Sequence, residues 1–321
     1  MEHRVGIVGA GVSGLTCGVV FAERGCRTAI FANEIGQQTT SGAAAAVWFP
    51  YDVEPAAKVI PWALEAYDML VDLTRDHDSG VSMIELRQCS RAEEIQIPDW
   101  AIPLGAQSAI PRPSTHSGRG SLKRFKSAFS LRVPLMDTTI YLDYLAARYL
   151  KAGGEINANV CFERLEDVDS EFDLVINCAG IGARSLVDDA ELEPHRGQVA
   201  IVPRIDDLSC AIVCDDLPLM YAIPRTRDCV FGGTNELSEN LDVDPKSTVR
   251  ILDECSRALA IDKPNVLAER VGLRPFRKSG VRLDRDQLRD GRTVIHNYGH
   301  GGSGFTLSWG CAREVLDLAR L

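Results

Sequence analysis

Short apolar runs separated by glycine, proline and charged residues follow one another along the chain. The first, Val5–Val8, has the length of a buried strand, and the stretch after it has the pattern of a helix as far as Arg24. A second apolar run, Thr28–Ala32, comes next. A strand, a helix and a second strand at this spacing predict a βαβ unit with parallel strands.

The middle of the chain carries further elements of both kinds. Leu135–Ala152 has the spacing of a helix, and Glu155–Phe162 is predicted as a strand. Asp173–Gly180 is an apolar run that ends in small residues. We interpret it as another parallel strand, whose carboxyl end meets a ligand.

The next part of the chain has shorter apolar runs with turn residues between them. They are Val199–Val202, Ala211–Cys214, Tyr221–Ile223 and Cys229–Phe231. This spacing predicts an antiparallel sheet, and the polar stretch Arg112–Gly120 is predicted as a loop. Because the chain has neither a repeat nor a long linker, we expect the two sheets to belong to interleaved domains.

Composition narrows the class of protein. Of the 321 residues, 45% are hydrophobic and 25% charged, as in a soluble globular protein of about two domains. The net charge of −10 argues against a nucleic-acid-binding surface. No apolar run approaches the roughly 20 residues of a membrane helix, and the immediate start of a strand leaves no room for a signal peptide.

The ten cysteines include no CxxC pair, and several lie in apolar runs, among them Cys17, Cys178 and Cys229. We interpret them as reduced core thiols of a protein in a reducing compartment. A redox pair of Cys210 and Cys214 is the alternative.

The first strand leads into the motif Gly9-x-Gly11-x-x-Gly14. The motif alone is a weak signal, but inside a βαβ unit it predicts a dinucleotide site. Gly9 permits the tight turn, Gly11 lets the backbone approach a pyrophosphate, and Gly14 lets the helix pack on the strand. Val12 and Ser13 open the helix, whose free N–H groups and dipole favour phosphate. A glycine-rich turn without a ligand is the alternative.

The end of the second strand departs from the usual pattern of such a site. An acidic residue normally holds the ribose hydroxyls there, but Asn33 occupies the position and Glu34 follows it. An amide binds a hydroxyl less strongly than a carboxylate does. Glu34 disfavours the additional phosphate of NADP, so both residues are candidates for a ribose contact.

Five segments together resemble the D-amino acid oxidase family, from Arg4 to the last helix. They are VGIVGAGVSGL (5–15), TTSGAAAAVWFPY (39–51), a turn at RGQ (196–198), YAIPR with GGT (221–225 and 232–234), and VGLRPFR with HNYGHGGSGFTLSWG (271–277 and 296–310). The resemblance implies an α/β fold in which a Rossmann-like FAD-binding domain is interleaved with an antiparallel-sheet substrate domain. The expected boundaries are 1–50, 135–195 and 270–321 for the first domain, and 51–134 and 196–269 for the second.

Arg274 stands in an apolar frame, where a guanidinium costs several kcal/mol unless an anion pairs with it. The resemblance implies that this arginine clamps a substrate carboxylate with two hydrogen bonds, for which its geometry is suited, and that the hydroxyl of Tyr221 contacts the same group. For Arg274 the alternative is a structural salt bridge with an internal carboxylate, a role that suits Arg277 better. For Tyr221 the alternative is a strand tyrosine without a role in binding.

The resemblance also assigns residues to FAD. His300–Gly304 matches a loop along the flavin ring and leads into a helix whose N-terminus favours negative charge on the ring. His300 itself is expected to be structural rather than a base. The further candidates for cofactor contact are Thr39, Thr40, Ser41, Ala45, Ala46, Val47, Val160, Ala179, Gly180, Gly301, Gly302, Ser303, Gly304, Phe305 and Thr306, together with Arg274.

Three departures from the family pattern concern the substrate pocket. Leu217 replaces a lid tyrosine, Phe49 replaces a polar pocket residue, and the 22 residues between RGQ and Tyr221 are too few for the long lid of the vertebrate enzymes. With Ile223 and Gly302, Phe49 and Leu217 are expected to bound the substrate. These changes predict substrates with apolar rather than acidic side chains, although Arg225 is a candidate partner for an acidic substrate side chain.

The implied activity is oxidative deamination of D-amino acids, in which FAD takes a hydride from the α carbon and molecular oxygen is reduced to peroxide. The alternatives are a D-aspartate or D-glutamate oxidase, a glycine-type amine oxidase, an escort protein that keeps the fold without the cofactor, and an NAD dehydrogenase. We expect no nucleic-acid or membrane partner, and a homodimer is left open. A cytoplasmic location is expected, although the terminal Ala319-Arg320-Leu321 resembles a peroxisomal signal.

Overall fold

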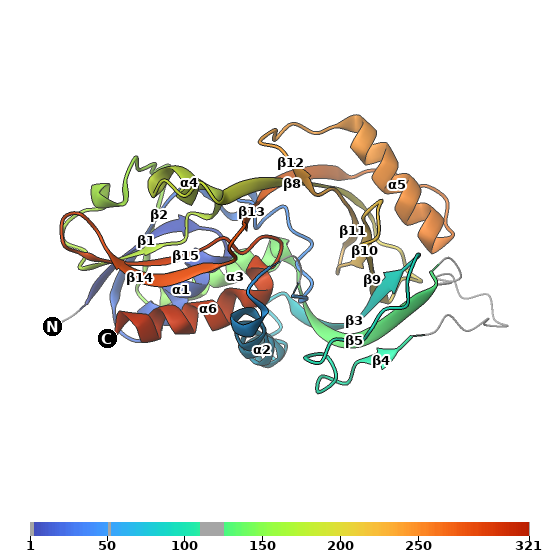
Figure 1. Ribbon diagram of the computed structural model, residues 1–321, viewed down its shortest axis with the longest axis horizontal. Helices are drawn as coiled ribbons and strands as arrows, with labels where there is room; N and C mark the ends of the chain where they lie inside the picture. The colour runs from blue at the N-terminus through green and yellow to red at the C-terminus, as the bar shows by residue number, and fades with distance from the viewer. Residues whose placement is uncertain (1–2, 51–52, 110–124, 321) are drawn as a thin grey trace.

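The computed structural model describes residues 3–50, 53–109 and 125–320. Its strands form two sheets, which occupy opposite ends of the molecule in Figure 1. The predicted loop Arg112–Gly120 and the last residue, Leu321, lie outside the described residues. The fold is a mixture of parallel and antiparallel sheets with helices, as predicted.

The first sheet has six strands in the order β14-β15-β7-β1-β2-β6. Their bounds are β1 (Arg4–Ala10), β2 (Arg27–Ile35), β6 (Glu155–Ala158), β7 (Leu174–Asn177), β14 (Arg282–Gln287) and β15 (Thr293–Tyr298). All are parallel to their neighbours except β14, which is antiparallel to β15. The predicted βαβ unit and the parallel strand before Gly180 are thereby confirmed.

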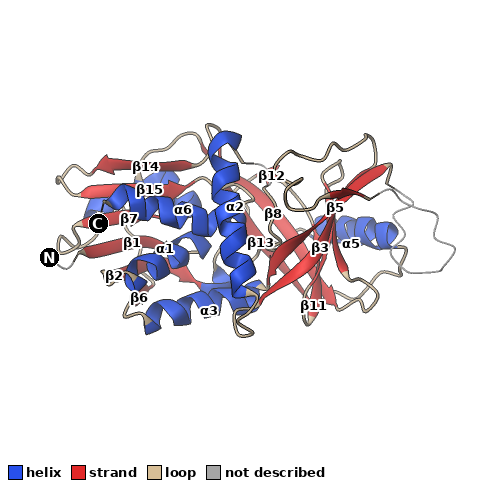
Figure 2. Ribbon diagram, turned by 90° about the horizontal axis from the view of Figure 1, so that it is seen from below, coloured by secondary structure: helices blue, strands red, loops and turns tan. Residues whose placement is uncertain are grey.

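Helices cover one face of this sheet. α1 (Val12–Glu23) packs on β1 and β2 between α3 (Thr138–Lys151) and α6 (Gly304–Ala319). α2 (Ala56–Leu73) packs against α6 and stands upright between the two ends of the molecule in Figure 2. The other face of the sheet is closed by apolar residues of the loop before β7, with Val168 and Phe172 at its centre.

The second sheet has nine strands among the described residues. They are β3 (Val81–Ser90), β4 (Gln107–Ser108), β5 (Ser127–Met136), β8 (Leu192–Pro203), β9 (Cys210–Cys214), β10 (Met220–Pro224), β11 (Asp228–Gly232), β12 (Glu236–Leu237) and β13 (Ala268–Arg277). β9, β10, β11 and β8 are antiparallel neighbours, as predicted. α5 (Pro245–Leu259) packs on β8, β10 and β11 and closes a second apolar core.

Several predicted elements begin or end elsewhere. The predicted helix over 135–152 begins only at Thr138, because Leu135 and Met136 pair with β3 and Asp137 caps the helix by accepting from the backbone N–H of Thr139 (3.1 Å). The strand predicted over 155–162 ends at Ala158. The RGQ segment is not a turn: it lies within β8, where β13 pairs with it along its whole length.

The domain boundaries remain a prediction. β13 belongs to the nine-stranded sheet, so the boundary expected at residue 270 does not coincide with a change of sheet. β2 continues to Ile35, which places Asn33 and Glu34 in its last residues rather than after it.

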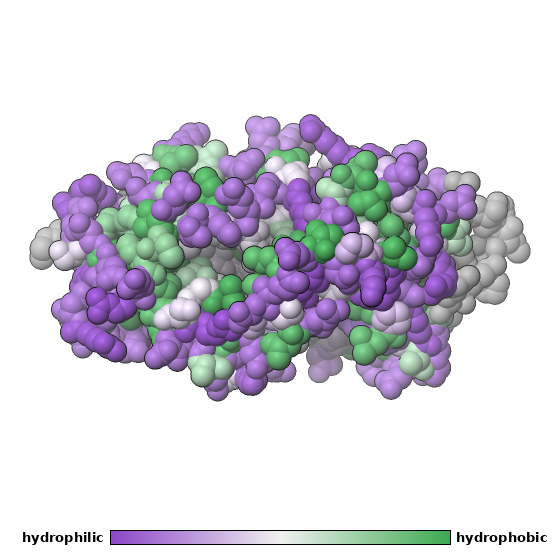
Figure 3. Space-filling model, turned by 90° about the horizontal axis from the view of Figure 1, so that it is seen from above, coloured by the Kyte–Doolittle hydropathy of each residue, from purple (hydrophilic) through white to green (hydrophobic). Residues whose placement is uncertain are grey.

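All ten cysteines are free thiols, and Cys17, Cys178 and Cys229 are buried as expected. Cys210 and Cys214 lie at the two ends of β9, about 13 Å apart at strand spacing, too far for a disulfide. No helix among the described residues is long and apolar enough to cross a membrane. Figure 3 shows a mainly hydrophilic upper face with scattered apolar residues.

Candidate active site

A cavity of about 620 Å³ lies between the two sheets. Residues at the carboxyl ends of β1, β2 and β7 line one part of it, and residues of β8, β9, β10 and β13 line another. Its volume lies in the range of cofactor and ligand sites. The position agrees with the general rule that ligands of open α/β sheets bind beyond the carboxyl ends of the strands.

Three glycines shape the turn from β1 into α1. Gly9 has a φ of +108°, and a Cβ there would lie 2.4 Å from the carbonyl oxygen of Cys178. A Cβ on Gly14 would lie 1.9 Å from the carbonyl oxygen of Gly9, so the helix can approach the strand only with glycine at this position. Gly11 faces the cavity, and a Cβ there would lie 3.1 Å from the Oγ of Ser41.

The N-terminus of α1 points its backbone at the cavity. The N-cap residue, Gly11, has no side chain to cap the helix, and the Oγ of Ser41 accepts from the N–H of Val12 alone (3.0 Å). Gly11, Val12 and Ser13 all line the cavity. An uncapped helix start of this kind offers N–H groups and a positive dipole end to an anion.

The last residues of β2 form the polar end of the cavity. Asn33 and Glu34 line it next to Val160, whose N–H donates to the carbonyl oxygen of Ala32 (3.0 Å). Ala179 and Gly180, after β7, line the same region. This combination of an amide, a carboxylate and small apolar side chains suits a ribose and a flat ring.

Arg274 and Tyr221 meet at the other end. The guanidinium lies over Gly197, where a Cβ would come within 2.6 Å of Cζ, so the glycine of RGQ leaves the space that Arg274 occupies. The ring of Tyr221 lies in the same way against Gly232, where a Cβ would be 2.0 Å from Cζ. Burial raises the pKa of the Tyr221 hydroxyl, and the charge of Arg274 lowers it in part.

Arg274 is fixed by the backbone and not by an acid. Its Nη1 donates to the carbonyl oxygen of Thr234 (2.8 Å). Within the described ranges no carboxylate forms an ion pair with it. A half-buried guanidinium that lines a cavity without an internal anion is suited to bind an anion from outside.

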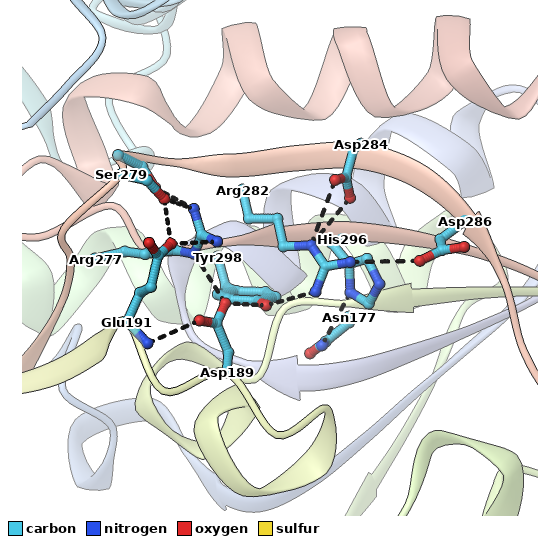
Figure 4. A network of polar contacts seen from close by, with 11 residues as sticks. Asn177, Asp189, Glu191, Arg277, Ser279, Arg282, Asp284, Asp286, His296 and Tyr298 are labelled. Carbon is cyan, nitrogen blue, oxygen red and sulfur yellow. Dashed lines mark hydrogen bonds and ion pairs between the residues drawn. The ribbon is translucent and has the colours of Figure 1, made fainter.

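Arg277, three residues further along β13, has a structural role, as expected. Figure 4 shows it in a network that connects β13 with β14 and β15. Its Nε donates to Asp189 (2.8 Å), which also accepts from the hydroxyl of Tyr298 (2.7 Å), and its Nη2 pairs with Glu191 (2.8 Å). Burial alone would raise the pKa of Asp189, but these hydrogen bonds hold it below its usual value.

The loop before α6 closes the cavity from a third side. Gly301, Gly302, Gly304 and the first residues of α6 line it, and no side chain caps this helix either. The hydroxyl of Thr306 donates to the carbonyl oxygen of Phe49 (3.0 Å) and accepts from its N–H (3.1 Å). The start of α6 is therefore joined to the segment around Phe49.

His300 is buried at the base of this loop. Its Nε2 contacts the Oδ1 of Asn297 (3.0 Å), and burial lowers its pKa to about 4. The ring is therefore neutral near pH 7 and is a weak base. This agrees with the expected structural role.

Comparison with known proteins assigns the family. Residues 4–318 match the family model of the FAD dependent oxidoreductases. The chain is 36% identical to a D-amino-acid oxidase of Streptomyces coelicolor, with 99% of this chain and 97% of the relative aligned, and 31% identical to the human D-aspartate oxidase, with 98% and 94% aligned. The chain belongs to the FAD-dependent oxidoreductases.

A solved structure supports the fold. The chain superposes on the glycine oxidase of Geobacillus kaustophilus with a TM-score of 0.83 at 18% identity, over 99% of this chain and 95% of the other. At this identity the likeness concerns the fold alone.

The cavity fits FAD. The glycine turn before α1 is a cradle that any Cβ would fill, and the uncapped starts of α1 and α6 face the same space. The first would hold the pyrophosphate, with Asn33 and Glu34 at the ribose, and the second would lie beside the flavin ring. The escort protein without a cofactor and the NAD dehydrogenase are thereby set aside.

Most residues predicted to contact FAD line this cavity. They are Gly9, Gly11, Val12, Ser13, Asn33, Glu34, Thr39, Thr40, Ser41, Ala45, Ala46, Val47, Val160, Ala179, Gly180, Arg274, Gly301, Gly302, Gly304, Phe305 and Thr306. Gly14 and Ser303 do not: Gly14 packs the helix on the strand, and Ser303 is fully buried at the start of α6. The individual contacts with FAD remain predictions.

Of the predicted substrate-pocket residues, Phe49, Ile223 and Gly302 line the cavity. Leu217 does not line it: its side chain is 89% exposed, and its predicted part in the substrate pocket stays a prediction. The short connection from β9 to β10 turns it outward, and Leu219, two residues later, lines the cavity in its place.

Arg225 also lies away from the cavity. Its side chain is 1% exposed and binds Asp228 with two hydrogen bonds, Nε to Oδ1 (2.7 Å) and Nη2 to Oδ2 (2.9 Å). It therefore has an internal partner and does not face the space that Ile223 lines.

Val213, Asp215 and Leu219 are among the residues of the cavity wall that the sequence analysis did not predict. The two-residue period of a strand could have indicated two of them, Val213 and Asp215. In an extended strand, side chains two residues apart share a face, so Asp215 is expected on the same side as Val213, which is paired in register with Tyr221.

Proposed function

We propose that the protein is a D-amino acid oxidase, which converts a D-amino acid, oxygen and water into a 2-oxo acid, ammonia and hydrogen peroxide. The observation that carries the proposal is the guanidinium of Arg274 at the cavity wall, fixed by the carbonyl of Thr234 and beside the hydroxyl of Tyr221. An amino acid carboxylate is the anion that this pair suits. The relatives at 32–36% identity that are named D-amino-acid oxidase point the same way.

Arg274 and Tyr221 hold and orient the substrate. The guanidinium binds the carboxylate with two parallel hydrogen bonds, and the hydroxyl of Tyr221 donates a third. FAD, when bound, supplies the hydride acceptor for the α-carbon hydrogen. A substrate whose carboxylate is held by two residues has few orientations open to it. The α-carbon hydrogen is thereby kept close to the acceptor, which is catalysis by proximity.

Phe49, Ile223 and Leu219 bound the side chain and exclude water from it. Gly302, in the loop before α6, lines the cavity and has no side chain that would take up space for the substrate. The start of α6, where no side chain caps the helix, would favour negative charge on the flavin.

No strong base is needed if the substrate amine arrives neutral. His300 fits this requirement, because with a pKa of about 4 it neither donates nor accepts a proton near pH 7. Its contact with Asn297 fixes the loop instead.

An acidic substrate is the second candidate, since one relative is a D-aspartate oxidase. The placement of Arg225 speaks against it. The cation that could bind a second carboxylate is committed to Asp228 and lies outside the cavity. A glycine-type amine oxidase is supported by the fold alone.

The test is a peroxide assay with paired D- and L-amino acids on protein whose flavin content is known. We expect peroxide from D-alanine and D-methionine and none from their L enantiomers. Acid precipitation should release the flavin into the supernatant, because the attachment is expected to be non-covalent. Peroxide from the L enantiomers alone, or protein that cannot be loaded with FAD, would contradict the proposal.

The assembly and the cellular location are also proposals. The described residues include large exposed apolar side chains, for example Leu150, Leu217 and Leu267. A homodimer is therefore one proposed assembly, and light scattering would detect it. A cytoplasmic location is the simpler proposal, and localisation of the full chain in cells would test it.

A further inference from the structure

The segment 232–234 contacts both groups of the proposed carboxylate clamp. A Cβ on Gly233 would lie 2.7 Å from the hydroxyl oxygen of Tyr221, and the carbonyl oxygen of Thr234 accepts from Nη1 of Arg274 (2.8 Å). Thr234 itself is 2% exposed and does not line the cavity. It can therefore act on a substrate only through the groups that it holds.

The sheet is irregular at this segment. β11 ends at Gly232 and β12 begins at Glu236, and both strands pair with β8. Between the two pairings, residues 233–235 lie opposite residues 197–198, so one side has an extra residue, as in a β-bulge. An extra residue of this kind turns groups away from the regular ladder, and here the carbonyl oxygen of Thr234 accepts from a side chain of β13.

The hydroxyl of Thr234 supplies β8 with hydrogen bonds that a regular neighbouring strand would make. It accepts from the N–H of Gln198 (2.8 Å) and donates to the carbonyl oxygen of Arg196 (3.3 Å). Gln198 and Arg196 are 0% and 4% exposed, so their backbone groups depend on partners within the protein. The hydroxyl thus fixes Thr234 to β8, and with it the carbonyl oxygen that orients Arg274.

The same segment is joined to α5. Arg250 donates from Nη2 to the carbonyl oxygen of Gly233 (3.3 Å). The side-chain amide of Gln198 donates to the hydroxyl of Thr248 near the start of the helix (2.8 Å). The segment therefore belongs to a polar network between β8 and α5, and Thr234 connects this network to Arg274.

We propose that Thr234 is a positioning residue, whose hydroxyl holds the backbone carbonyl that orients Arg274 towards a bound carboxylate. The inference rests on the proposed function, because it takes Arg274 as the clamp. A neutral carbonyl oxygen orients the guanidinium and leaves its charge to the substrate. A carboxylate side chain in the same place would compete with the substrate for that charge.

The experiment measures kcat/KM for D-alanine and the dissociation constant of propionate in the wild type, Thr234→Val, Thr234→Ser and Thr248→Val. Propionate is alanine without the amine, so it keeps the carboxylate but cannot be deaminated, and the absorbance of the flavin reports its binding. Valine keeps the shape of threonine and removes the hydroxyl, whereas serine keeps the hydroxyl. Thr248→Val removes another buried hydroxyl of the same network, which binds the side chains of Gln198 and Glu269.

In Thr234→Val we expect kcat/KM to fall about five- to twentyfold and the dissociation constant of propionate to rise by a similar factor, because Arg274 loses its orientation. Thr234→Ser and Thr248→Val should stay within about twofold of the wild type in both quantities. Flavin content should be equal in all four proteins. Equal losses in Thr234→Val and Thr248→Val, or a serine variant as impaired as the valine variant, would overturn the inference.

A thiol at the same position provides a second comparison if Thr234→Val does not hold FAD. Thr234→Cys keeps a weaker donor and acceptor, so kcat/KM should fall by only about two- to fivefold. An unchanged kcat/KM in this variant would then overturn the inference.

A double-mutant cycle distinguishes the positioning of Arg274 from a general effect on the sheet. In the Arg274→Ala background, Thr234→Val should change kcat/KM by less than about twofold, because no guanidinium remains to be oriented. A general effect on the sheet would lower kcat/KM by the same factor in both backgrounds, and that result would overturn the inference.

Propionate binding separates this inference from the proposed function. If the wild type oxidises D-alanine and Thr234→Val changes neither turnover nor propionate binding, the inference fails and the function holds. If no D-amino acid is oxidised but propionate binds in a way that depends on both Arg274 and Thr234, the function fails and the inference holds. If the wild type neither oxidises D-amino acids nor binds propionate, both are wrong.

Discussion

Arg274 and Thr234 are joined by a hydrogen bond of 2.8 Å from Nη1 to the backbone carbonyl oxygen. Gly197 lies directly beneath the same guanidinium. A neutral backbone acceptor fixes the orientation of the group without neutralising its charge, so the charge remains available to a bound carboxylate. The arginine is thus oriented before substrate arrives.

The first prediction concerns this clamp. Replacing Arg274 with Ala should lower kcat/KM for D-amino acids by roughly two to four decades, or about 3–5 kcal/mol, because the substrate carboxylate is buried without its partner. Flavin content should be nearly unchanged. The control is Lys278→Ala, since Lys278 directly follows the strand that carries Arg274, is exposed and pairs with Glu193 of β8 (2.7 Å), so this change should not alter turnover. Turnover of Arg274→Ala within about threefold of the wild type would show that Arg274 is not the clamp.

The second prediction concerns the glycine turn. Gly14→Ala places a Cβ 1.9 Å from the carbonyl oxygen of Gly9 and must move either α1 or β1. Overpacking of this kind costs about 1–3 kcal/mol, which predicts FAD binding weaker by about five- to 150-fold. Fluorescence titration of the apoprotein with FAD measures it. An unchanged dissociation constant would mean that the turn does not hold the cofactor.

The elements of the fold could be predicted where the apolar pattern is continuous, as in β1 and β7. The failures have local causes. Leu135 and Met136 fit the period of a helix, but they belong to β5 because they pair with β3. The apolar pattern of a single segment does not show which other segment it pairs with. The RGQ segment has the composition of a turn, but it lies in β8 because it pairs with β13. Its glycine is needed because a Cβ there would overlap the guanidinium of Arg274 on the neighbouring strand.

The site could be predicted where a residue type has one strong physical requirement. Gly9 and Arg274 are examples: one needs a positive φ and the other an anion. Leu217 could not be placed in this way, because the direction of a side chain in the connection from β9 to β10 depends on how that connection turns. Arg225 was ambiguous until Asp228 was seen to bind it.

The third prediction is a pH dependence of stability. Burial lowers the pKa of both His296 and His300 to about 4, against about 6.5 in the unfolded chain. Between these values the unfolded state binds more protons than the folded one, so the free energy of unfolding should fall as pH drops from 6.5 towards 4. The slope should approach about 1.4 kcal/mol per pH unit for each histidine.

Urea unfolding at several pH values, with FAD in excess, measures this slope. His300→Gln should reduce it by about one proton, because the replaced side chain does not titrate. A wild-type stability that is constant between pH 4 and 6.5 would contradict the burial of these neutral rings.

The last prediction concerns substrate choice: kcat/KM should be at least about tenfold higher for D-methionine and D-phenylalanine than for D-aspartate. Phe49, Ile223 and Leu219 offer no partner to a second carboxylate, and burying an unpaired charge is costly. Arg225, which could have been that partner, donates from Nε and Nη2 to Asp228 and from Nη1 to the hydroxyl of Thr138. The short connection before Tyr221 should also admit bulky side chains. If D-aspartate or D-glutamate gives the higher kcat/KM, Arg225 must leave Asp228 when substrate binds, and Arg225→Ala would then abolish the acidic preference alone.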